Sequence, residues 1–529
     1  MQASLLENPE ETPKPKRPNT ALKILRIGWP IMFMRMAGQV RGLLTYWLLN
    51  HQSAGTHDST QVAAFSLADL WCRVTGLCFI FGLGGGLDTF ASQAWGAKEH
   101  KKLGLQVFRA FLLLTLVING PIIVFWLFAE DILTAAGQDA AVAKLVGVYA
   151  RIAIPGQCCL TLTCVLTKML TAMGKTGKML MINLFFTAVG IGLTYLAVQA
   201  LNLGVFGAAV VSSSLQIMQA LVYLGVVARD ADCRKCWPGL TIRAFQGWWP
   251  YLKIALPCFL MGVCEWWSWD LVTFLAGECH TVTGHPHIFG GNLTDTPREI
   301  LAAQGLMQQV LSTSYVLATG VGRGTGTVVG NSLGAGDHIG AAHACRIGVL
   351  MGCAAMGIGS AGLILLRDDW RYIFRADPGL TNIMRVMIWW VAGFGFEDGV
   401  QTVLAAVIIG AGKQAVTVPL LIVAYWILGL PLGGVAALEP HFNYGLLGIW
   451  WGMLLGVTIH CGYFVLLCFC PCMPGAIRWR EAAEAAARRV AAVGEEEGPP
   501  TDGGAINDAA TSPLDAQQAV DADGEQRER

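Results

Sequence analysis

The residues best suited to chemistry are two carboxylates, Glu265 and Asp270, within the apolar stretch LPCFLMGVCEWWSWDL. Residues 247–277 are mostly apolar and exceed the roughly twenty residues that a membrane-spanning helix needs. An ionised carboxylate inside a bilayer is costly, so it normally faces a partner or a path for an ion or a substrate. Three tryptophans flank the two acids: Trp266, Trp267 and Trp269. Acids beside aromatic rings suit a proton, a metal cation or an organic cation, and the alternative is a polar pair that only locks helices together.

The composition of the whole chain indicates a membrane protein. The 529 residues are 54% hydrophobic and 14% charged, whereas soluble domains average about 25% charged residues. The net charge is zero, so no overall field attracts nucleic acid, and we expect no nucleic-acid partner. The 16 cysteines lie mostly inside apolar runs and are better read as small hydrophobic residues than as a disulfide framework.

The elements that must position these acids are twelve apolar segments, each long enough to cross a bilayer. They lie near 22–49, 61–92, 103–129, 145–173, 179–201, 205–229, 247–277, 299–332, 340–366, 381–411, 415–437 and 445–470. The fold class expected is therefore an all-α integral membrane protein with twelve transmembrane helices. Several segments exceed the minimum length, which predicts tilt or projection beyond the bilayer.

Basic residues predict the orientation of these helices. Most lysines and arginines outside the apolar segments fall on the side that holds both ends of the chain, although Arg367 and its neighbours oppose this assignment. We expect both termini in the cytoplasm and the loop 278–298 outside. That loop carries an acceptor pattern for N-glycosylation at Asn292 and three histidines that are more typical of a solvated loop than of a metal site. The sequence leaves open whether the membrane is the plasma membrane or a vacuolar or other organellar one.

The two halves of the chain repeat each other. Four short motifs recur in the same order: IGWP (27–30) and IALP (254–257), WGAKEH (95–100) and LGAGDH (333–338), AMGK (172–175) and GAGK (410–413), GVFG (204–207) and GLLG (445–448). Six helices per repeat give both halves the same topology, so we expect two six-helix lobes related by a pseudo-two-fold axis along the membrane normal, with a substrate site between them. The expected parts are a cytoplasmic N-terminal tail (1–21), an N-terminal lobe (22–230), a cytoplasmic loop (231–246), a C-terminal lobe (247–472) and a cytoplasmic tail (473–529), with a short helix over 475–493 and disorder after it.

Several of these stretches resemble the multidrug and toxic compound extrusion (MATE) transporters, eukaryotic branch. They are GLDTFASQAWGA (86–97), CEWWSWD (264–270), VGNSLGAGD (329–337) and FEDGVQ with GAGKQ (396–414). The resemblance implies twelve helices and export of organic solutes in exchange for protons or sodium. It also implies that Glu265 and Asp398 form a proton or cation site, with Asp270 as a second acid, and that Gln309 replaces an acid found in animal members.

The N-terminal half departs from the family pattern. Arg35 and Arg73 stand where the resemblance implies cavity-facing amides. Asp69 lies four residues before Arg73 and can pair with it, whereas Arg35 has no acid three or four residues away. The residues assigned to the substrate cavity are Arg35, Gln39, Asp69, Arg73, Trp266, Gln309 and Tyr315. Lys168, Arg323 and Arg41 add buried positive charge, and Asp88 is the acid that could neutralise Arg35 or Arg41 structurally instead.

The function expected is therefore a secondary antiporter with an organic small-molecule substrate. No Walker pattern and no nucleophile beside a base occur in the sequence, so we expect neither enzyme activity nor a cofactor beyond the coupling ion. The lone pair Cys233 and Cys236 lacks the further ligands of a zinc site. We expect a monomer. The alternatives are a lipid-linked-sugar flippase of the same superfamily and a channel-like protein that does not pump.

Overall fold

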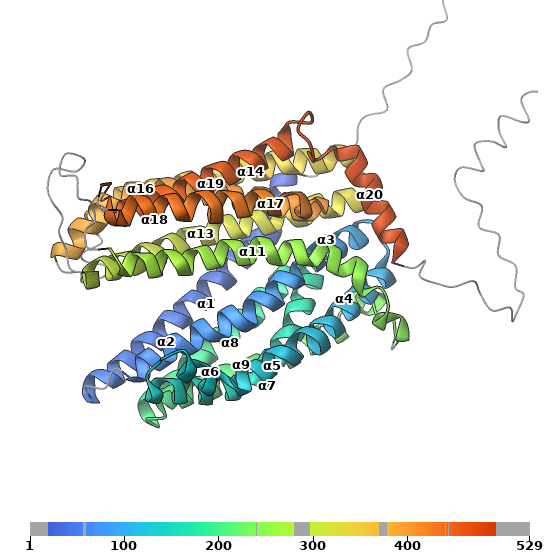
Figure 1. The fold of residues 1–529 in the computed structure, drawn as a ribbon. Helices are drawn as coiled ribbons and strands as arrows, with labels where there is room; N and C mark the ends of the chain where they lie inside the picture. Colours follow the sequence, from blue (N-terminus) through green and yellow to red (C-terminus); the bar gives the residue numbers. More distant parts are fainter. Residues whose placement is uncertain are drawn as a thin grey trace, which may run out of the picture. The chain divides into compact units, whose positions relative to one another are not determined.

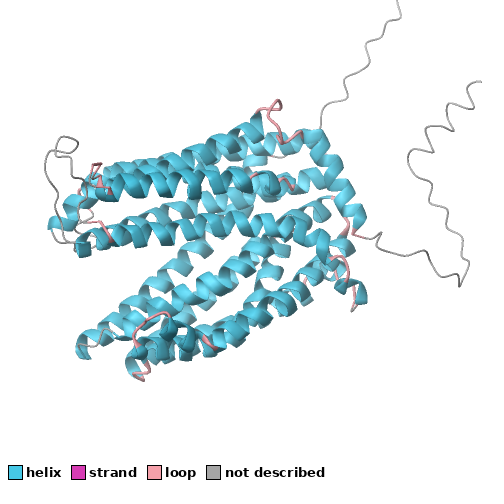
Figure 2. Ribbon diagram, viewed as in Figure 1, coloured by secondary structure: helices cyan, strands magenta, loops and turns pink. Residues whose placement is uncertain are grey.

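The computed structural model describes residues 19–56, 60–239, 241–279, 297–369, 378–439, 441–442 and 444–493. These residues belong to one compact unit and are helical, with turns and short loops between the helices and no strand among them (Figure 2). The predicted glycosylation site at Asn292, the loop histidines His280, His285 and His287, and the tail beyond Val493 lie outside the described residues.

Within the described residues the chain makes twelve long helical passages, at the positions that the apolar segments predict (Figure 1). The first six are α1 (Thr20–Thr56), α2 (Thr60–Cys72) continued by η1 (Arg73–Leu77) and α3 (Cys78–Gly96), α4 (His100–Leu112) continued by η2 (Leu113–Ile118) and α5 (Asn119–Leu127), α7 (Ala140–Ala172), α8 (Thr176–Tyr195) continued by η3 (Leu196–Ala200), and α9 (Gly204–Arg229). The second six are α11 (Trp248–Gly277), α13 (Pro297–Gly334), α14 (His338–Leu365), α16 (Pro378–Ala411), η5 (Gln414–Val416) continued by α17 (Val418–Leu421), η6 (Ile422–Gly429) and α18 (Leu430–Leu438), and α19 (Gly445–Phe469). Shorter helices are α6 (Ala129–Ala135), α10 (Ala231–Lys235), η4 (Ile242–Phe245) and α20 (Trp479–Ala492).

Nine of the passages in the described part of the chain are long and apolar enough to cross a membrane by composition alone. The other three are α1, α11 and α13, each of which carries two or more of the predicted site residues. They carry Arg35, Glu265 and Tyr315 respectively, together with further charged or polar residues. Their lower hydropathy therefore has a structural reason: each presents a polar face toward other helices rather than toward lipid.

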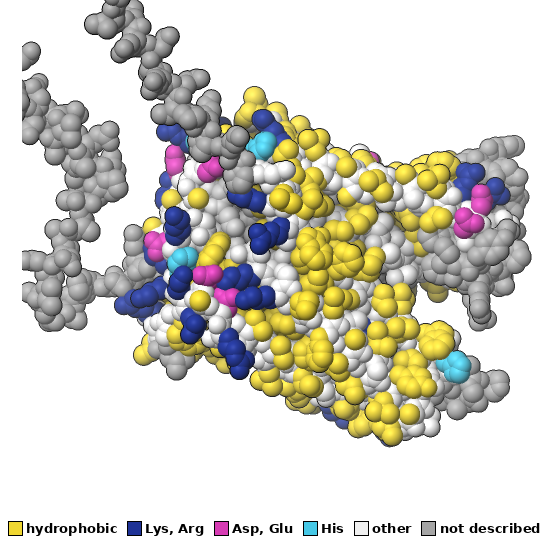
Figure 3. All heavy atoms as spheres, turned by 180° about the vertical axis from the view of Figure 1, so that it is seen from behind, with side chains coloured by type: hydrophobic (Ala, Val, Ile, Leu, Met, Phe, Trp, Pro, Cys, Tyr) yellow, Lys and Arg dark blue, Asp and Glu magenta, His cyan; other side chains and the backbone are white. Residues whose placement is uncertain are grey.

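The lipid-facing surface is visible as exposed apolar side chains along the helices. On α1 they recur at helical spacing: Trp29, Phe33, Met36, Val40, Leu43 and Trp47. Figure 3 shows a broad apolar belt, with most of the lysines and arginines on this face at one end of it and a smaller charged group at the other. Apolar residues on the outside of a helical protein, bounded by charge, are typical of a surface immersed in a bilayer.

The internal repeat is visible in the backbone. Three pairs of equivalent turn positions share a left-handed conformation: Gly174 and Gly412 (φ 70° and 71°), Gly204 and Gly445 (φ 54° and 51°), and Lys98 and Gly336 (φ 61° and 75°). This conformation is readily accessible to glycine but strained for lysine. Equal backbone geometry at corresponding turns supports a duplicated six-helix unit. The exact division of the chain into lobes and tails stays a prediction.

The two halves meet closely at the end of the molecule that carries α20, and their helices spread apart toward the other end (Figure 1). A Cβ atom built on Gly96 of α3 would lie 2.0 Å from the carbonyl oxygen of Asn331 in α13. One built on Gly28 of α1 would lie 2.5 Å from the carbonyl oxygen of Gly320, also in α13. Glycine is required there because the backbones touch. We call this the closed end, and the opposite end the open end.

Helix α20 lies across both halves at the closed end. Nε of Arg489 donates a hydrogen bond to the side-chain oxygen of Gln93 in α3 (3.0 Å), and Nη2 donates to the carbonyl oxygen of Ala411 in α16 (3.0 Å). Val490 packs with the first half and Ala486 with the second. The predicted helix over 475–493 is thus confirmed as α20, but its docking between the halves was not predicted.

Candidate functional site

The centre of the candidate site is a pair of acids in the second half, Glu265 on α11 and Asp398 on α16. Their carboxyl groups are close enough to repel each other electrostatically. Asp398 is 4% exposed, and its Oδ1 atom has no hydrogen-bond partner among the described residues. A buried carboxyl group and a half-buried one that repel each other ionise together only at a high cost in free energy, unless a cation compensates them. The arrangement can therefore hold a proton or a small cation.

Two residues that the sequence analysis missed lie beside this pair. The hydroxyl of Tyr425, in the wide turns of η6, is buried without a partner in the described structure, and η6 packs against α11, the helix that carries Glu265. The ring of His460 on α19 contacts Tyr425 edge to face at 5.6 Å, and both of its nitrogens are likewise unpartnered there. A histidine within an apolar span was the signal that could have identified it. The acid pair thus has a buried hydroxyl and a buried imidazole among its neighbours.

Tyr315 lies on α13, the helix of the second half that packs against α1. Its hydroxyl oxygen accepts a hydrogen bond from Thr402 Oγ1 of α16 (3.1 Å). The predicted cavity residue Tyr315 is therefore tied to the helix that carries Asp398.

Arg35 points toward the second half of the protein. Gly28, seven residues before Arg35, touches α13. Gln39, four residues after it, donates from its side-chain nitrogen to a carbonyl oxygen of α13 (3.1 Å). Residues at these spacings share one face of a helix, so Arg35 faces α13 rather than lipid. Its side chain is exposed, it has no acidic partner in the described chain, and Arg323 is near enough to repel it. Arg35 is thus an accessible cation without a protein counter-ion.

The alternative that Asp88 neutralises Arg35 or Arg41 is wrong. The Asp88 carboxylate on α3 instead pairs with Lys168 on α7 and Arg323 on α13. Arg41 lies against Gly190 of α8, on a different face of α1. Helix α3 packs against both α7 and α13, so Asp88 lies beside the cations of those two helices. The triad joins the two halves of the protein near the closed end.

Asp69 and Arg73 form the predicted ion pair, at 3.2 Å. Their side chains are 44% and 47% exposed, so the pair is accessible rather than buried. Arg73 begins the π-helical segment η1 and also interacts electrostatically with Asp270 of the other half. π-Helical turns are frequent at functional sites. Arg73 is therefore paired with a carboxylate, unlike Arg35.

The three tryptophans of α11 do not form one cage. Trp269 packs into the core of the second half, with its ring 5.0 Å from Phe394 and 5.8 Å from Trp450. Trp267 is exposed, and Trp266 is half-buried. Consecutive helical residues point about 100° apart, so three neighbours cannot share one surface. Gln309 is half-buried, and its side chain has no partner among the described residues.

Neither cysteines nor other side chains form a metal site within the described ranges. Burial raises the pKa of the Cys233 thiol to about 12 and that of the Cys236 thiol to about 11, beside the short helix α10. These two cysteines are thus thiols at neutral pH.

The comparison with protein families identifies this arrangement of helices and polar residues. The family model described as MatE matches residues 30–196 and 288–435, which together are more than half of the chain. The chain belongs to the MatE family. The two matched regions of this MatE protein fall in the two halves that share turn geometry. Proteins of this family are transporters, and the chain is accordingly a multi-pass membrane transporter.

Named relatives of this MatE chain come from plants and animals. Protein DETOXIFICATION 16 of Arabidopsis thaliana is 27% identical over 405 residues, which are 77% of this chain and 80% of the relative. Multidrug and toxin extrusion protein 2 of Mus musculus is 29% identical over 407 residues, 76% of this chain and 67% of the relative. The crystal structure of the eukaryotic MATE transporter AtDTX14 matches with a TM-score of 0.78 at 23% identity, covering 89% of this chain and 99% of that one. The twelve-helix fold predicted from the sequence is thereby confirmed.

Proposed function

We propose that this transporter is a secondary antiporter that exports organic solutes in exchange for protons or sodium by alternating access. The observation that supports it most is the acid pair Glu265 and Asp398, which lies without a counter-ion in the described structure. A pair of this kind gains stability when a proton or a cation occupies it. Occupancy removes a repulsion and so changes which conformation of the two halves is favoured.

The conformation described here fits one end state of such a cycle. The closed end is sealed by touching backbones, by the Asp88 triad and by Arg489 of α20. The pair Asp69 and Arg73, on the side of the open end, is accessible. Switching access would require the contacts at the closed end to separate, while the two halves move as largely rigid bodies.

We propose that the closed end faces the cytoplasm. The turns at this end carry most of the lysines and arginines, among them Lys101, Lys175, Lys178 and Lys235. Cytoplasmic loops are enriched in these residues. A tag fused after Val493 should then be inaccessible in intact cells and accessible after permeabilisation. Labelling of the tag in intact cells would reverse the orientation.

The coupling proposal is tested in proteoliposomes with an imposed gradient of protons or of sodium. Wild type should transport organic solutes only when one of the two gradients is present. Glu265→Gln and Asp398→Asn should abolish gradient-driven transport, because an amide cannot take up a proton or balance a cation. The matched control is Glu397→Gln, since Glu397 neighbours Asp398 but accepts a hydrogen bond from Thr458 instead (2.6 Å). Transport that depends on neither gradient, or that persists in the Glu265→Gln variant, contradicts the proposal.

We propose further that the substrate site is bipolar. Its second half presents acids and Trp266, and its first half presents Arg35 without a protein counter-ion. A guanidinium with no carboxylate partner favours a bound anionic group and disfavours a cation. The site therefore accepts zwitterions or organic anions as well as cations.

A competition series of matched cationic, zwitterionic and anionic solutes tests this proposal. Arg35→Gln should weaken the anionic and zwitterionic competitors and leave or improve the cationic ones. Arg41→Gln is the matched control, because Arg41 lies on the same helix but against α8. An unchanged ranking in Arg35→Gln would show that the arginine is structural. Binding of lipid-linked anions alone, with no soluble solute bound, would instead favour a flippase.

A further inference from the structure

The internal repeat places two polar side chains at equivalent positions of the closed end. Gln93 of α3 lies three residues before Gly96, and Asn331 of α13 lies three residues before Gly334, which is the counterpart of Gly96 in the repeated motif. A Cβ atom built on Gly334 would lie 2.0 Å from the carbonyl oxygen of Gln93, just as one built on Gly96 would lie 2.0 Å from that of Asn331. The contact between α3 and α13 is therefore symmetric at these two residues.

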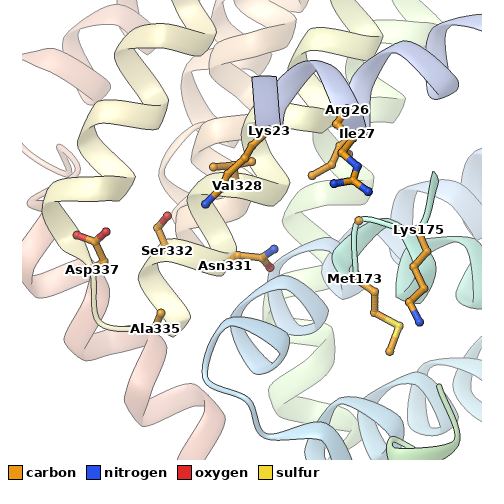
Figure 4. Close-up of a pocket in the computed structure, with 11 residues that line it drawn as sticks. Lys23, Arg26, Ile27, Met173, Lys175, Val328, Asn331, Ser332, Ala335 and Asp337 are labelled. Atoms are coloured by element: carbon orange, nitrogen blue, oxygen red, sulfur yellow. The ribbon is translucent and has the colours of Figure 1, made fainter. Parts of the chain in front are cut away.

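The two side chains make reciprocal hydrogen bonds between the halves. Nε2 of Gln93 donates to the carbonyl oxygen of Gly410 at the end of α16 (2.9 Å). Nδ2 of Asn331 donates to the carbonyl oxygen of Ala172 at the end of α7 (3.2 Å), and Figure 4 shows this side chain extending toward the turn after α7. Gly410 and Ala172 begin the repeated motifs GAGK and AMGK, so the acceptors are equivalent too. The last carbonyl groups of a helix lack a partner within the helix, and here each half supplies a donor to the other.

Helix α20 supports only one of these two bonds. The side-chain oxygen of Gln93 accepts from Nε of Arg489, whose guanidinium carbon lies 2.8 Å from a Cβ atom built on Gly412. At the equivalent place beside Asn331 there is instead a cavity of about 640 Å³, which Asn331 and Gly174 help to line (Figure 4). The side-chain oxygen of Asn331 has no partner in the described structure. The two bonds are thus equivalent in the repeat, but a further helix holds only the one at Gln93.

We infer that Gln93 and Asn331 are the gate residues of the closed end, and that α20 stabilises the gate on one side through Arg489. Separation of the halves at this end breaks both bonds together and leaves the two carbonyl groups to water. A direct hydrogen bond is worth about fivefold in an equilibrium over its hydrated alternative, so each bond favours the sealed conformation. Gln93 contributes more than Asn331, because it also holds Arg489. The inference rests on the alternating access proposed above.

The experiment measures two distances in the full chain in nanodiscs, without any ion gradient. Spin labels on noncanonical residues leave the native cysteines in place. One pair, at Lys101 and Ile339, spans the closed end, and a second pair, at Leu201 and Leu438, spans the open end; all four positions are exposed.

Loss of either gate residue should shift both distances in opposite directions. Asn331→Leu should raise the population with a wide closed-end distance about fivefold, and Gln93→Met should raise it further. The same variants should raise the population with a short open-end distance. The matched control is Thr327→Val, because the buried hydroxyl of Thr327 donates to Arg323 in its own helix and not to the other half.

A double-mutant cycle tests the contribution of α20. Arg489→Gln combined with Asn331→Leu should widen the closed end about fivefold beyond Asn331→Leu alone, since the two changes affect separate bonds. Combined with Gln93→Met, Arg489→Gln should add less, because its partner on α3 is already missing. Equal effects of Arg489→Gln in the two backgrounds would overturn the role of α20.

Two results would overturn the gate itself. One is a closed-end distance that stays at the wild-type value in both single variants. The other is a wider closed end with no change at the open end, which is local loosening rather than a change of access. Gln93→Ala and Asn331→Ala keep the test valid if the larger substitutions do not fold. Neither distance depends on transport, so these results are separate from those of the proteoliposome experiment.

Discussion

The buried triad of Asp88, Lys168 and Arg323 makes an asymmetric prediction about stability. One carboxylate serves two cations, and the side chains are 18%, 8% and 37% exposed in that order. Removing the carboxylate with Asp88→Asn leaves both cations without their shared partner. Removing one cation with Lys168→Met leaves the carboxylate paired with Arg323.

The burial of each group sets the size of the effect. Lys168 is the most buried of the three, so Asp88→Asn leaves an uncompensated charge where water does not reach it. Breaking a buried pair in this way costs about 3–5 kcal/mol of unfolding free energy. The Lys168→Met change keeps one charge pair and fills the space with an apolar side chain, so it should cost less than about 1.5 kcal/mol.

Denaturant unfolding of the purified chain in detergent, followed by tryptophan fluorescence, measures both variants against wild type. Arg323→Gln is the second control, because it leaves Asp88 bound to Lys168 and removes a cation that solvent reaches. Asp88→Asn should be the least stable of the three. If Lys168→Met destabilises the chain as much as Asp88→Asn does, Asp88 is not the shared counter-ion and the reasoning is refuted.

Three further predictions concern the closed end. Arg489→Gln removes two hydrogen bonds that bridge the halves. Cysteines introduced at this end should then react with a thiol label about fivefold faster or more, because about 1 kcal/mol of stabilisation of the closed end is lost. The exposed Arg488 serves as the control, and Arg488→Gln should label at the wild-type rate. Gly96→Ala should have the same effect because its Cβ would meet the backbone of α13, whereas Gly177→Ala, with open space around it, should not. Burial opposes ionisation of Asp230, but hydrogen bonds from two lysines prevail and hold the pKa of that carboxyl well below its usual range. The unfolding free energy that Asp230 contributes should be constant at neutral pH and fall as pH drops below about 4, the ordinary aspartate pKa. Asp230→Asn should make the unfolding free energy fall less steeply at acid pH, and an unchanged fall would contradict this prediction.

Much of the candidate site could be predicted because intramembrane acids and arginines stand out against an apolar background. Glu265 was recognised in this way, and the pair of Asp69 with Arg73 followed from helical spacing, whereas Asp398 and Arg35 were identified through the resemblance to the MATE family. Tyr425 and His460 were not predicted: His460 stood out as a histidine within an apolar span, but nothing in the sequence near either residue indicates that the two lie near the acids. The roles of all these residues in coupling or substrate binding stay predictions.

The sequence by itself determined the twelve helices, the internal repeat and the family. These are local properties: an apolar run of sufficient length must satisfy its backbone as a helix in a bilayer, and a turn needs its glycine wherever it occurs. Only the tertiary structure decided which charges meet. Asp88 could have neutralised a cation of α1, but packing of α3 against α7 and α13 gave it other partners and left Arg35 free of an acid in the described chain. Likewise α20 was predictable as a helix, but its place across the two halves depends on surfaces that come together only when the chain is folded.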